Sequence, residues 1–480
     1  MMAMRCWLLA LLVARTAGAE PRRVVVDTPP EAFARTQAAA APYLYLNRCS
    51  GGCPITGATM NDASSQASSI PVPGSYVVTE FANAANEIGA AADAEWNAIV
   101  TCLKEVYSPY GLVVSDEPPP PGTSFNEAII AGQPQDIGLG GDILGIAPLA
   151  NDCSAVDNVI SFSFANHHLP NERVLNVCWT AAQESAHAYG LDHEFKFSDG
   201  TSACSDPMTY RVDCGGQKFF RNKRATCGET VERECKCTST QNSHQHLLSL
   251  FGAGTPLTPA PEASIIYPTN GAAVTPGWVA HVSAGSQRGV AKVELYLNDS
   301  RWMVLPGAGF GPRGQDIPSD YTFYLPASVP DGIIDLQAKA YDDLGLGVAS
   351  LPITVTKGAP CTSDDACADH QTCDEGRCRF AAPTGELGDS CSYGQFCRSW
   401  TCLGSEGDQR CTQECLTDEP TSCPMGFSCE QTADQSTAGF CWPEDTGGGC
   451  CSAGHDRDAL WLHGGLALLV LGSLRRRRHR

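Results

Sequence analysis

The stretch QESAHAYGLDH, residues 183–193, decides how the N-terminal half of this chain is expected to fold. The residues before it, 171–182, have helix-forming composition, and Gly190 is suited to the left-handed turn that ends a helix. Positions four apart lie on one face of a helix, and the chain can return toward that face after the glycine turn. We therefore expect one shared site to contain Gln183, Glu184, His187 and His193.

These residues and their spacing resemble the zinc-binding motif of the metzincin proteases, HExxHxxGxxH, except that Gln183 stands in the place of the first His. The resemblance implies one catalytic Zn²⁺ with three protein ligands, an open position for water and a carboxylate next to that water. By the same resemblance, His187 and His193 are metal ligands, Gln183 is an atypical third ligand, and Glu184 is the general base.

The stretch CSDPMTY, residues 204–210, extends the same resemblance. Metzincins have a methionine turn beneath the metal site, shortly after the third ligand, and Met208 lies fifteen residues after His193. Tyr210 then forms the M-x-Y arrangement of astacin-like and serralysin-like members. The resemblance implies that Met208 is the hydrophobic floor of the site. It implies that Tyr210 is catalytic, as an additional ligand or as a donor to the oxyanion.

Gln183 leaves three alternatives open, because a side-chain amide oxygen is a weaker donor to zinc than imidazole. In the first, Gln183 binds zinc weakly or binds a different metal. In the second, another group completes the site, and the candidates are His167, His168, Asp192 and Tyr210. In the third, the chain keeps the fold and has given up the metal.

Four other histidines near the motif, and Asp192, are favoured for roles other than metal binding. His167 and His168 follow a predicted strand, where a place at the surface or in the substrate cleft is favoured over ligation. His244 and His246 begin a predicted helix and are expected to be solvated or to cap it. Asp192 is expected to face solvent or to brace its loop.

The residues upstream of the motif predict a helix and a sheet. Residues 95–116, EWNAIVTCLKEVYSPYGLVVSD, have the pattern of an amphipathic helix that runs into a strand at 111–115. Further strands are expected at EAIIAG, 127–132, and at NVISFSF, 158–164. This order fits the metzincin upper subdomain, so we expect an α+β metzincin-like domain over residues 41–254.

Composition narrows the class of partner. Acidic residues outnumber basic ones 53 to 32, and the formal net charge is −21. Because nucleic acid requires a basic face, no nucleic-acid partner is expected. The resemblance to metzincins implies a protein or peptide substrate, and nothing in the sequence indicates an oligomer.

Both ends of the chain have the composition of targeting segments. Residues 1–19 combine Arg5, an apolar run and a small-residue site at 17–19, which is the build of a secretory signal peptide, and the 25 cysteines agree with export. In the tail, 446–480, an apolar segment at 459–474 precedes an arginine cluster and follows a cysteine pair. This tail resembles the MYXO-CTERM sorting signals. The resemblance implies delivery to the cell surface or outer envelope of a bacterium, with the segment either removed or kept as a transmembrane anchor.

Four further regions follow from composition. Residues 20–40 are expected to be a flexible leader and 255–263 a Pro-rich linker. Residues 264–357 contain no cysteine and have short alternating runs, which predict an all-β sandwich that resembles bacterial immunoglobulin-like modules. Residues 358–445 carry twelve cysteines in three successive groups of four, which predict a threefold disulfide-rich repeat.

Alternatives remain for several of these cysteines and loops. Zinc ligation is the alternative to disulfides in the repeat, and Ca²⁺ binding is the alternative to a solvated loop at CTSDDAC, 361–367. In the first domain, the ten cysteines permit full pairing. Cys49 and Cys53 are expected to form a local disulfide, and the alternative is that one of them caps the zinc as a thiolate.

Two hypotheses of different class follow. The first is an exported, cell-surface zinc metalloendopeptidase that hydrolyses peptide bonds in proteins with Glu184 as base. The second is a catalytically inactive surface binding or adhesion protein that uses the same fold. Metal content and Glu184-dependent hydrolysis separate them.

Overall fold

The structure is a computed structural model that describes residues 22–33, 40–211, 217–309, 318–405, 407–417, 422–431 and 438–444. The expected signal peptide and sorting tail lie outside these ranges. Within them, no helix is both long and apolar enough to cross a membrane. Strand makes up 36% of the structure and helix 17%, so the chain is mostly β, and the α-helices among the described residues all lie in the N-terminal domain.

A six-stranded mixed sheet forms the centre of the N-terminal domain, in the order β1-β8-β9-β7-β2-β6. Its strands are β1 (Arg22–Thr28), β2 (Tyr43–Asn47), β6 (Val113–Ser115), β7 (Asn126–Ile130), β8 (Ile143–Ala150) and β9 (Ile160–Ser163). β9, β7, β2 and β6 are parallel to one another, whereas β8 is antiparallel to β9 and β1 is parallel to β8. β1 and β8 therefore form one edge of the sheet and run against the other four strands.

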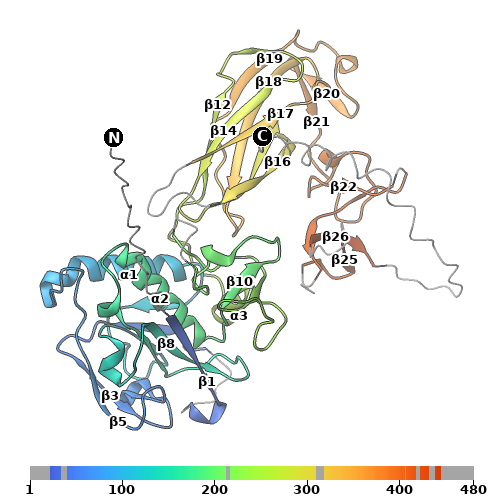
Figure 1. The fold of residues 1–480 in the computed structure, drawn as a ribbon. Helices are drawn as coiled ribbons and strands as arrows, with labels where there is room; N and C mark the ends of the chain where they lie inside the picture. Colours follow the sequence, from blue (N-terminus) through green and yellow to red (C-terminus); the bar gives the residue numbers. More distant parts are fainter. Residues whose placement is uncertain are drawn as a thin grey trace, which may run out of the picture. The chain divides into compact units, whose positions relative to one another are not determined.

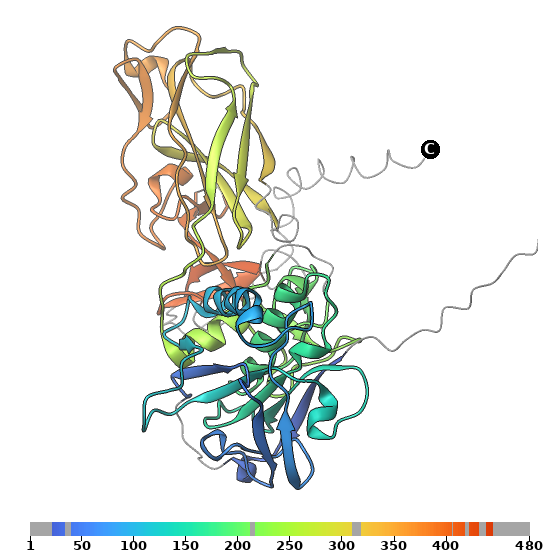
Figure 2. The same ribbon diagram turned by 90° about the vertical axis from the view of Figure 1, so that its left-hand side faces the viewer.

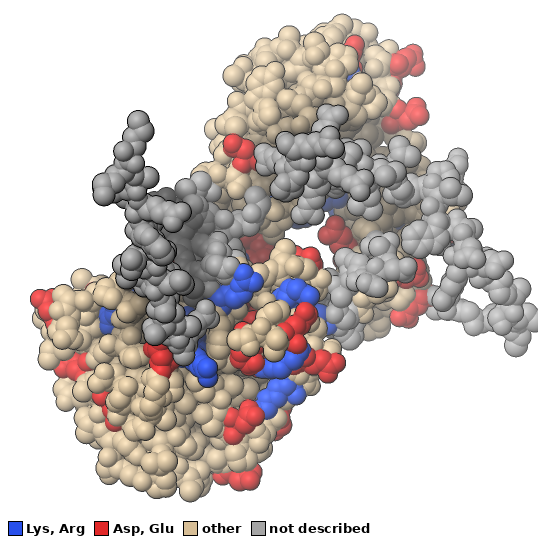
Figure 3. Space-filling model, viewed as in Figure 1, with Lys and Arg blue, Asp and Glu red and all other residues tan. Residues whose placement is uncertain are grey.

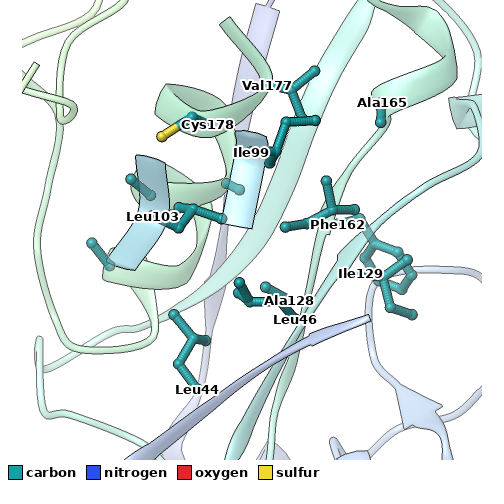
Figure 4. Close-up of a cluster of buried hydrophobic side chains, with 14 of the residues drawn as sticks. Leu44, Leu46, Ile99, Leu103, Ala128, Ile129, Phe162, Ala165, Val177 and Cys178 are labelled. Carbon is teal, nitrogen blue, oxygen red and sulfur yellow. The ribbon is translucent and has the colours of Figure 1, made fainter. Parts of the chain in front are cut away.

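Two helices, α1 (Asp93–Tyr107) and α2 (Arg173–His187), pack against each other on one side of this sheet, as both ribbon views show (Figure 1 and Figure 2). Apolar residues recur along α1 with helical spacing, so one of its faces is buried. Ile99 and Leu103 from α1, Val177 from α2, and Leu44 and Phe162 from the sheet are all fully buried and form part of one core (Figure 4). The predicted helix at 95 and the strands at 111, 127 and 158 are confirmed.

The other elements of this domain surround that core. They are β3 (Cys53–Gly57), β4 (Ala67–Ser68), β5 (Gly74–Val78), β10 (Glu194–Phe197), β11 (Ala225–Cys227), α3 (Ser243–Phe251) and the 3-10 turns η1 (Pro30–Ala32), η2 (Ala63–Ser65), η3 (Gly89–Ala92), η4 (Pro134–Ile137), η5 (Ala165–His167) and η6 (Ala203–Ser205).

The expectation of a flexible leader over 20–40 is wrong for residues 22–28. They form β1, because Val24 and Val26 pack against the core and the strand pairs with β8 along its whole length.

Disulfides tie the domain together. Cys102–Cys178 joins α1 to α2, and Cys153–Cys237 and Cys227–Cys235 hold the region after the site motif. Cys49 and Cys53 form the expected local disulfide. Neither sulfur of that pair is a thiolate, so the alternative of a zinc cap does not apply in this structure.

The next region is a β-sandwich, as predicted. One sheet has the order β12-β14-β17 and the other β13-β19-β18-β15-β16. Its strands are β12 (Glu262–Tyr267), β13 (Ala273–Val274), β14 (Val279–Gly285), β15 (Val290–Leu297), β16 (Ser300–Gly309), β17 (Ser319–Tyr324), β18 (Gly332–Tyr341) and β19 (Ile353–Lys357). Strict alternation of buried and less buried residues along β18 places one of its faces in the core between the sheets.

The cysteine-rich region consists of disulfides, in agreement with the preferred prediction. In each group of four cysteines, the first pairs with the third and the second with the fourth. The pairs are 361–373 and 367–378, 391–402 and 397–411, and 415–429 and 423–441. Short strands and turns frame them: η7 (Asp364–Ala366), β20 (Gln371–Asp374), β21 (Arg377–Phe380), η8 (Gly394–Phe396), β22 (Cys402–Leu403), β23 (Arg410–Cys411), β24 (Glu414–Leu416), β25 (Phe427–Gln431) and β26 (Ala438–Pro443). The third group belongs to a separate compact unit.

Candidate metal centre

The end of α2 and the turn after it position the two motif histidines. α2 ends at His187, and every residue from Val177 to His187 is buried. Gly190 adopts φ +91°, and a Cβ at this position would lie 2.2 Å from the carbonyl oxygen of Cys153. Only glycine fits there without displacing that backbone. The predicted left-handed turn is therefore present, and it returns the chain toward the last turn of α2.

His187 and His193 face each other across this turn. Their Nε2 atoms are 3.0 Å apart, and their rings are nearly perpendicular. His187 Nδ1 lies 2.7 Å from the carbonyl oxygen of Leu191, and His193 Nδ1 lies 3.1 Å from Oε1 of Glu229. Both partners can only accept, so each Nδ1 is the donor, and each neutral ring is left with a lone pair on Nε2. The two lone pairs point at each other, and this arrangement is stable when a proton or a metal ion lies between them.

The neutral form of His187 is the stable one. Burial, together with the neighbouring His193, lowers the pKa of His187 to about 3. Two imidazoles that bind one zinc at 2.0–2.1 Å in tetrahedral geometry have their nitrogens roughly 3.3 Å apart. The observed separation of 3.0 Å is close to that value. The pair thus fits a metal ion without rearrangement of the backbone.

Gln183 and Glu184 lie on the same helix one turn earlier, and both are 0% exposed. Neither the two amide atoms of Gln183 nor the two carboxylate oxygens of Glu184 have a hydrogen-bond partner. Buried polar groups without partners are uncommon and need an explanation such as an ion or water. The donor set of this site, two imidazoles with an amide and a carboxylate beside them, therefore suits a divalent cation.

Glu184 is held against strand β8. A Cβ at Gly145, in β8, would lie 2.6 Å from Oε1 of Glu184, so the strand backbone passes directly over this carboxylate. Burial raises the pKa of Glu184 well above its usual range, and the nearby Arg23 guanidinium acts in the opposite direction. A carboxyl group with a raised pKa and no fixed partner can exchange a proton with a reacting molecule.

The structure places Met208 in the core of the domain and Tyr210 beside His193. Met208 is fully buried in the main core, and its carbonyl oxygen accepts a hydrogen bond from the backbone N–H of Glu194 at 2.7 Å. The ring of Tyr210 stacks edge-on against His193, with 4.7 Å between ring centroids. Burial and the Glu184 carboxylate raise the pKa of the Tyr210 phenol, so it stays protonated and able to donate.

A charged loop that the sequence did not single out supports His193. The disulfide Cys227–Cys235 closes this loop, which carries Glu229 and Arg233. The Arg233 guanidinium donates to both carboxylate oxygens of Asp192, at 2.6 and 2.9 Å, and to Glu229 at 2.6 Å. Asp192 thus braces its loop, one of the two roles predicted for it. The only signal in the sequence was a run of charged residues between two close cysteines.

Asp192, His193 and Glu229 also form a cluster whose potential ligand atoms lie within 4.8 Å of one another. Glu229 faces Nδ1 of His193, which is on the other side of the ring from the Nε2 that meets His187. Both carboxylates are already paired with Arg233. We therefore interpret them as groups that orient His193 rather than as ligands.

Two histidine predictions need correction. His168 is buried, so it does not lie at the surface, and burial lowers its pKa to about 3. His167 is partly exposed and lies 2.8 Å from Asp142. His244 is neither solvated nor a cap, since it is buried against Tyr110 with 3.0 Å between Nδ1 and the hydroxyl. His246 contacts the carbonyl oxygen of Tyr189 at 2.6 Å.

The surface around the domain mixes both charges. On the face shown in Figure 3, Lys and Arg side chains lie beside Asp and Glu side chains. Lys196 pairs with Glu232 at 2.9 Å, and Lys223 pairs with Asp199 at 2.8 Å. This face has no continuous basic patch among the described residues.

Comparisons with known proteins give little further information. No family model and no curated protein matches the chain. Among solved structures, it is similar to fibronectin(III)-like modules of Clostridium thermocellum CbhA, with 22% identity, 20% of this chain and 96% of that chain covered, and a TM-score of 0.16. Wild-type OgpA from Akkermansia muciniphila matches with 8% identity over 70% of this chain and 96% of that chain, with a TM-score of 0.19. A β-glucosidase from Listeria innocua, in complex with isofagomine, matches with 10% identity over 69% of this chain and 48% of that chain, with a TM-score of 0.18. These TM-scores are too low to support any argument about fold or activity.

Proposed function

We propose that this chain is a zinc-dependent metalloendopeptidase with a metzincin-like catalytic domain. The observation that carries the proposal is the convergence of two imidazole lone pairs at 3.0 Å, with the partnerless Gln183 and Glu184 side chains on the same helix. His187 and His193 would hold the ion, and Gln183 would be the third ligand. When bound, zinc would supply Lewis acidity to a water molecule and to the peptide carbonyl.

The protein's own groups would then have separate tasks. Glu184 takes a proton from the attacking water and passes it to the leaving amine, a role that needs a carboxyl of raised pKa in a buried place. Tyr210, which stays protonated, donates to the oxyanion that develops on the carbonyl. Met208 supplies the apolar floor beneath the histidines.

We also propose that the chain is exported and delivered to the cell envelope through its C-terminal tail. Ten disulfides among the described residues support an oxidising compartment, since such density is rare in the cytosol. The β-sandwich and the disulfide repeats would then separate the catalytic domain from the tail.

The proposal is tested by metal content and by hydrolysis. The purified chain, dialysed against metal-free buffer, should retain about one zinc per molecule by elemental mass spectrometry, and His187→Ala should lose it. Glu184→Gln should keep the zinc and reduce casein hydrolysis by about 10²–10⁴-fold, the usual contribution of a general base. A chain without zinc that acquires it on Gln183→His would contradict the enzyme and favour the inactive binding protein.

A further inference from the structure

Two charged side chains of the β-sandwich are largely removed from solvent. Arg288 lies in the turn between β14 and β15, and Asp343 lies in the loop after β18. Their side chains are 0% and 9% exposed. The N-terminal domain and the sandwich belong to one compact unit of the chain. A guanidinium and a carboxylate at such a depth require close partners, because both lose their hydration.

Arg288 and Asp343 pair with each other and with one segment of the N-terminal domain. The Arg288 guanidinium donates to the two carboxylate oxygens of Asp343, at 2.7 and 3.1 Å, and to the carbonyl oxygen of Phe220 at 2.7 Å. Asp343 also accepts the backbone N–H of Asn222 at 3.0 Å. In return, the Arg221 guanidinium donates to the carbonyl oxygen of Arg288 at 2.6 Å. The sandwich therefore holds this segment, residues 219–222, by its main chain as well as by a side chain.

The charges of this cluster keep Asp343 ionised. Burial alone would raise the pKa of Asp343, but the Arg221 and Arg288 guanidinium groups hold it at about 2. Both guanidinium groups also lie over the ring of Phe219, at 5.6 and 5.1 Å from its centroid. Two cations thus share one carboxylate and one aromatic ring, so the loss of either sandwich residue disturbs the whole cluster.

Segment 219–222 also supports the turn that carries Met208. The backbone N–H of Arg221 donates to Oδ2 of Asp206 at 2.7 Å, and the backbone N–H of Met208 donates to Oδ1 of the same carboxylate at 2.8 Å. Asp206 is 0% exposed. The carbonyl oxygen of Ser205 accepts two further hydrogen bonds from the segment, one from Arg221 Nε at 3.2 Å and one from the backbone N–H of Phe219 at 3.1 Å. The segment and the turn are therefore fixed to each other.

The Met208 turn borders His193 on two sides. The carbonyl oxygen of Met208 accepts the backbone N–H of Glu194, which directly follows His193. Tyr210, two residues after Met208, packs its ring against the His193 imidazole. A displacement of the turn would therefore move a candidate metal ligand and the candidate oxyanion donor together.

We propose that Arg288 and Asp343 of the β-sandwich are positioning residues of the candidate metal centre. They hold the Met208 turn in place through segment 219–222 and the Asp206 carboxylate. The inference rests on the proposed function, because it adds positioning residues to the same site. Groups that orient metal ligands without touching the metal typically contribute 10- to 100-fold to metal affinity. The sandwich then supports the site in addition to separating it from the tail.

The first test follows the Met208 turn without any need for metal or activity. The full chain, lacking only the predicted signal peptide, is stripped of metal, and hydrogen–deuterium exchange is measured by mass spectrometry in peptides that contain Met208. Arg288→Ala should raise the exchange rate in these peptides at least tenfold. Arg301→Ala is the matched control, because it removes another arginine–carboxylate pair of the same sandwich, that with Glu294 at 3.0 Å. Its exchange rate in these peptides should stay within twofold.

A second variant guards against misfolding of the first. Asp343→Asn keeps the size of the side chain and one acceptor for the N–H of Asn222, but it removes the negative charge between two guanidinium groups. It should also raise exchange around Met208 at least tenfold. Arg288→Lys keeps the positive charge and should recover part of the protection that Arg288→Ala loses. An exchange rate in Asp343→Asn equal to that of the unaltered chain would overturn the positioning role, whether or not Arg288→Ala folds.

Zinc affinity, measured in competition with a chromophoric chelator, separates the two proposals. Faster exchange together with at least tenfold weaker zinc binding in Asp343→Asn, and unchanged binding in Arg301→Ala, supports both. Faster exchange with no zinc bound by any chain, the unaltered one included, keeps the support of the Met208 turn and rejects the metal centre. Tight zinc binding that is equal in the unaltered chain and in Asp343→Asn keeps the metal centre and rejects the positioning role.

Discussion

Removal of the Glu229 side chain should weaken zinc binding by roughly 10- to 100-fold. Glu229 accepts the hydrogen bond from Nδ1 of His193 at 3.1 Å and thereby fixes the tautomer that presents Nε2 to the metal. Loss of a carboxylate in this position typically costs 10- to 100-fold in metal affinity, which corresponds to about 1.4–2.8 kcal/mol. Arg233 would still hold Asp192, so the loop should keep its course.

The assay is a competition for zinc between the protein and a chromophoric chelator, with Glu229→Ala compared to the unaltered chain. Glu232→Ala is the matched control, because Glu232 lies in the same disulfide loop but is exposed and pairs with Lys196 and Thr226. Its zinc affinity should stay within twofold. If both variants bound zinc as tightly as the unaltered chain, the loop would have no part in orienting His193, and the tautomer argument would fail.

Three further outcomes are expected. Gln183→His should tighten zinc binding at least tenfold in the same competition assay, because a third imidazole replaces an amide; an unchanged affinity would place position 183 away from the ion. Gly190→Ala should lower the urea midpoint of unfolding far more than Gly200→Ala. Both glycines have positive φ, but a Cβ at Gly190 would lie 2.2 Å from the backbone oxygen of Cys153, whereas a Cβ at Gly200 would face open space. Equal shifts in the two variants would contradict this account. In the folded chain the pKa of His168 is lowered to about 3, whereas in the unfolded chain it is roughly 6.5. Between these two pH values His168 is protonated in the unfolded chain and neutral in the folded chain. Stability is therefore lost as pH falls through this window, and His168→Gln should have a smaller drop in urea midpoint between pH 7 and pH 5 than the unaltered chain.

The parts of the site that sequence alone predicted are those fixed by local geometry. α2, the turn at Gly190 and the approach of His193 to His187 depend on helical period and on one glycine, so spacing was sufficient. Met208 and Tyr210 followed from the family resemblance. In the sandwich and the disulfide repeats, alternation and cysteine grouping were equally direct signals.

The parts that were missed depend on contacts between distant segments. Residues 22–28 lie in a stretch whose average composition is that of a flexible leader, and the strand forms because β8 offers it an edge some 120 residues later. Glu229 reaches His193 only because the loop of Cys227 and Cys235 folds back on the site. The burial of His168 and His244 likewise follows from packing that no local pattern encodes.

The crossed disulfides of the C-terminal region make the chain tolerant of being cut. In each group the two loops overlap, so every peptide bond from 361 to 378, from 391 to 411 and from 415 to 441 is enclosed by at least one disulfide. A single nick inside these spans leaves the two fragments covalently joined. Between Cys361 and Cys441, a protease can sever the chain only at 379–390 or 412–414, so nicked molecules would separate on reducing gels while remaining intact on non-reducing ones.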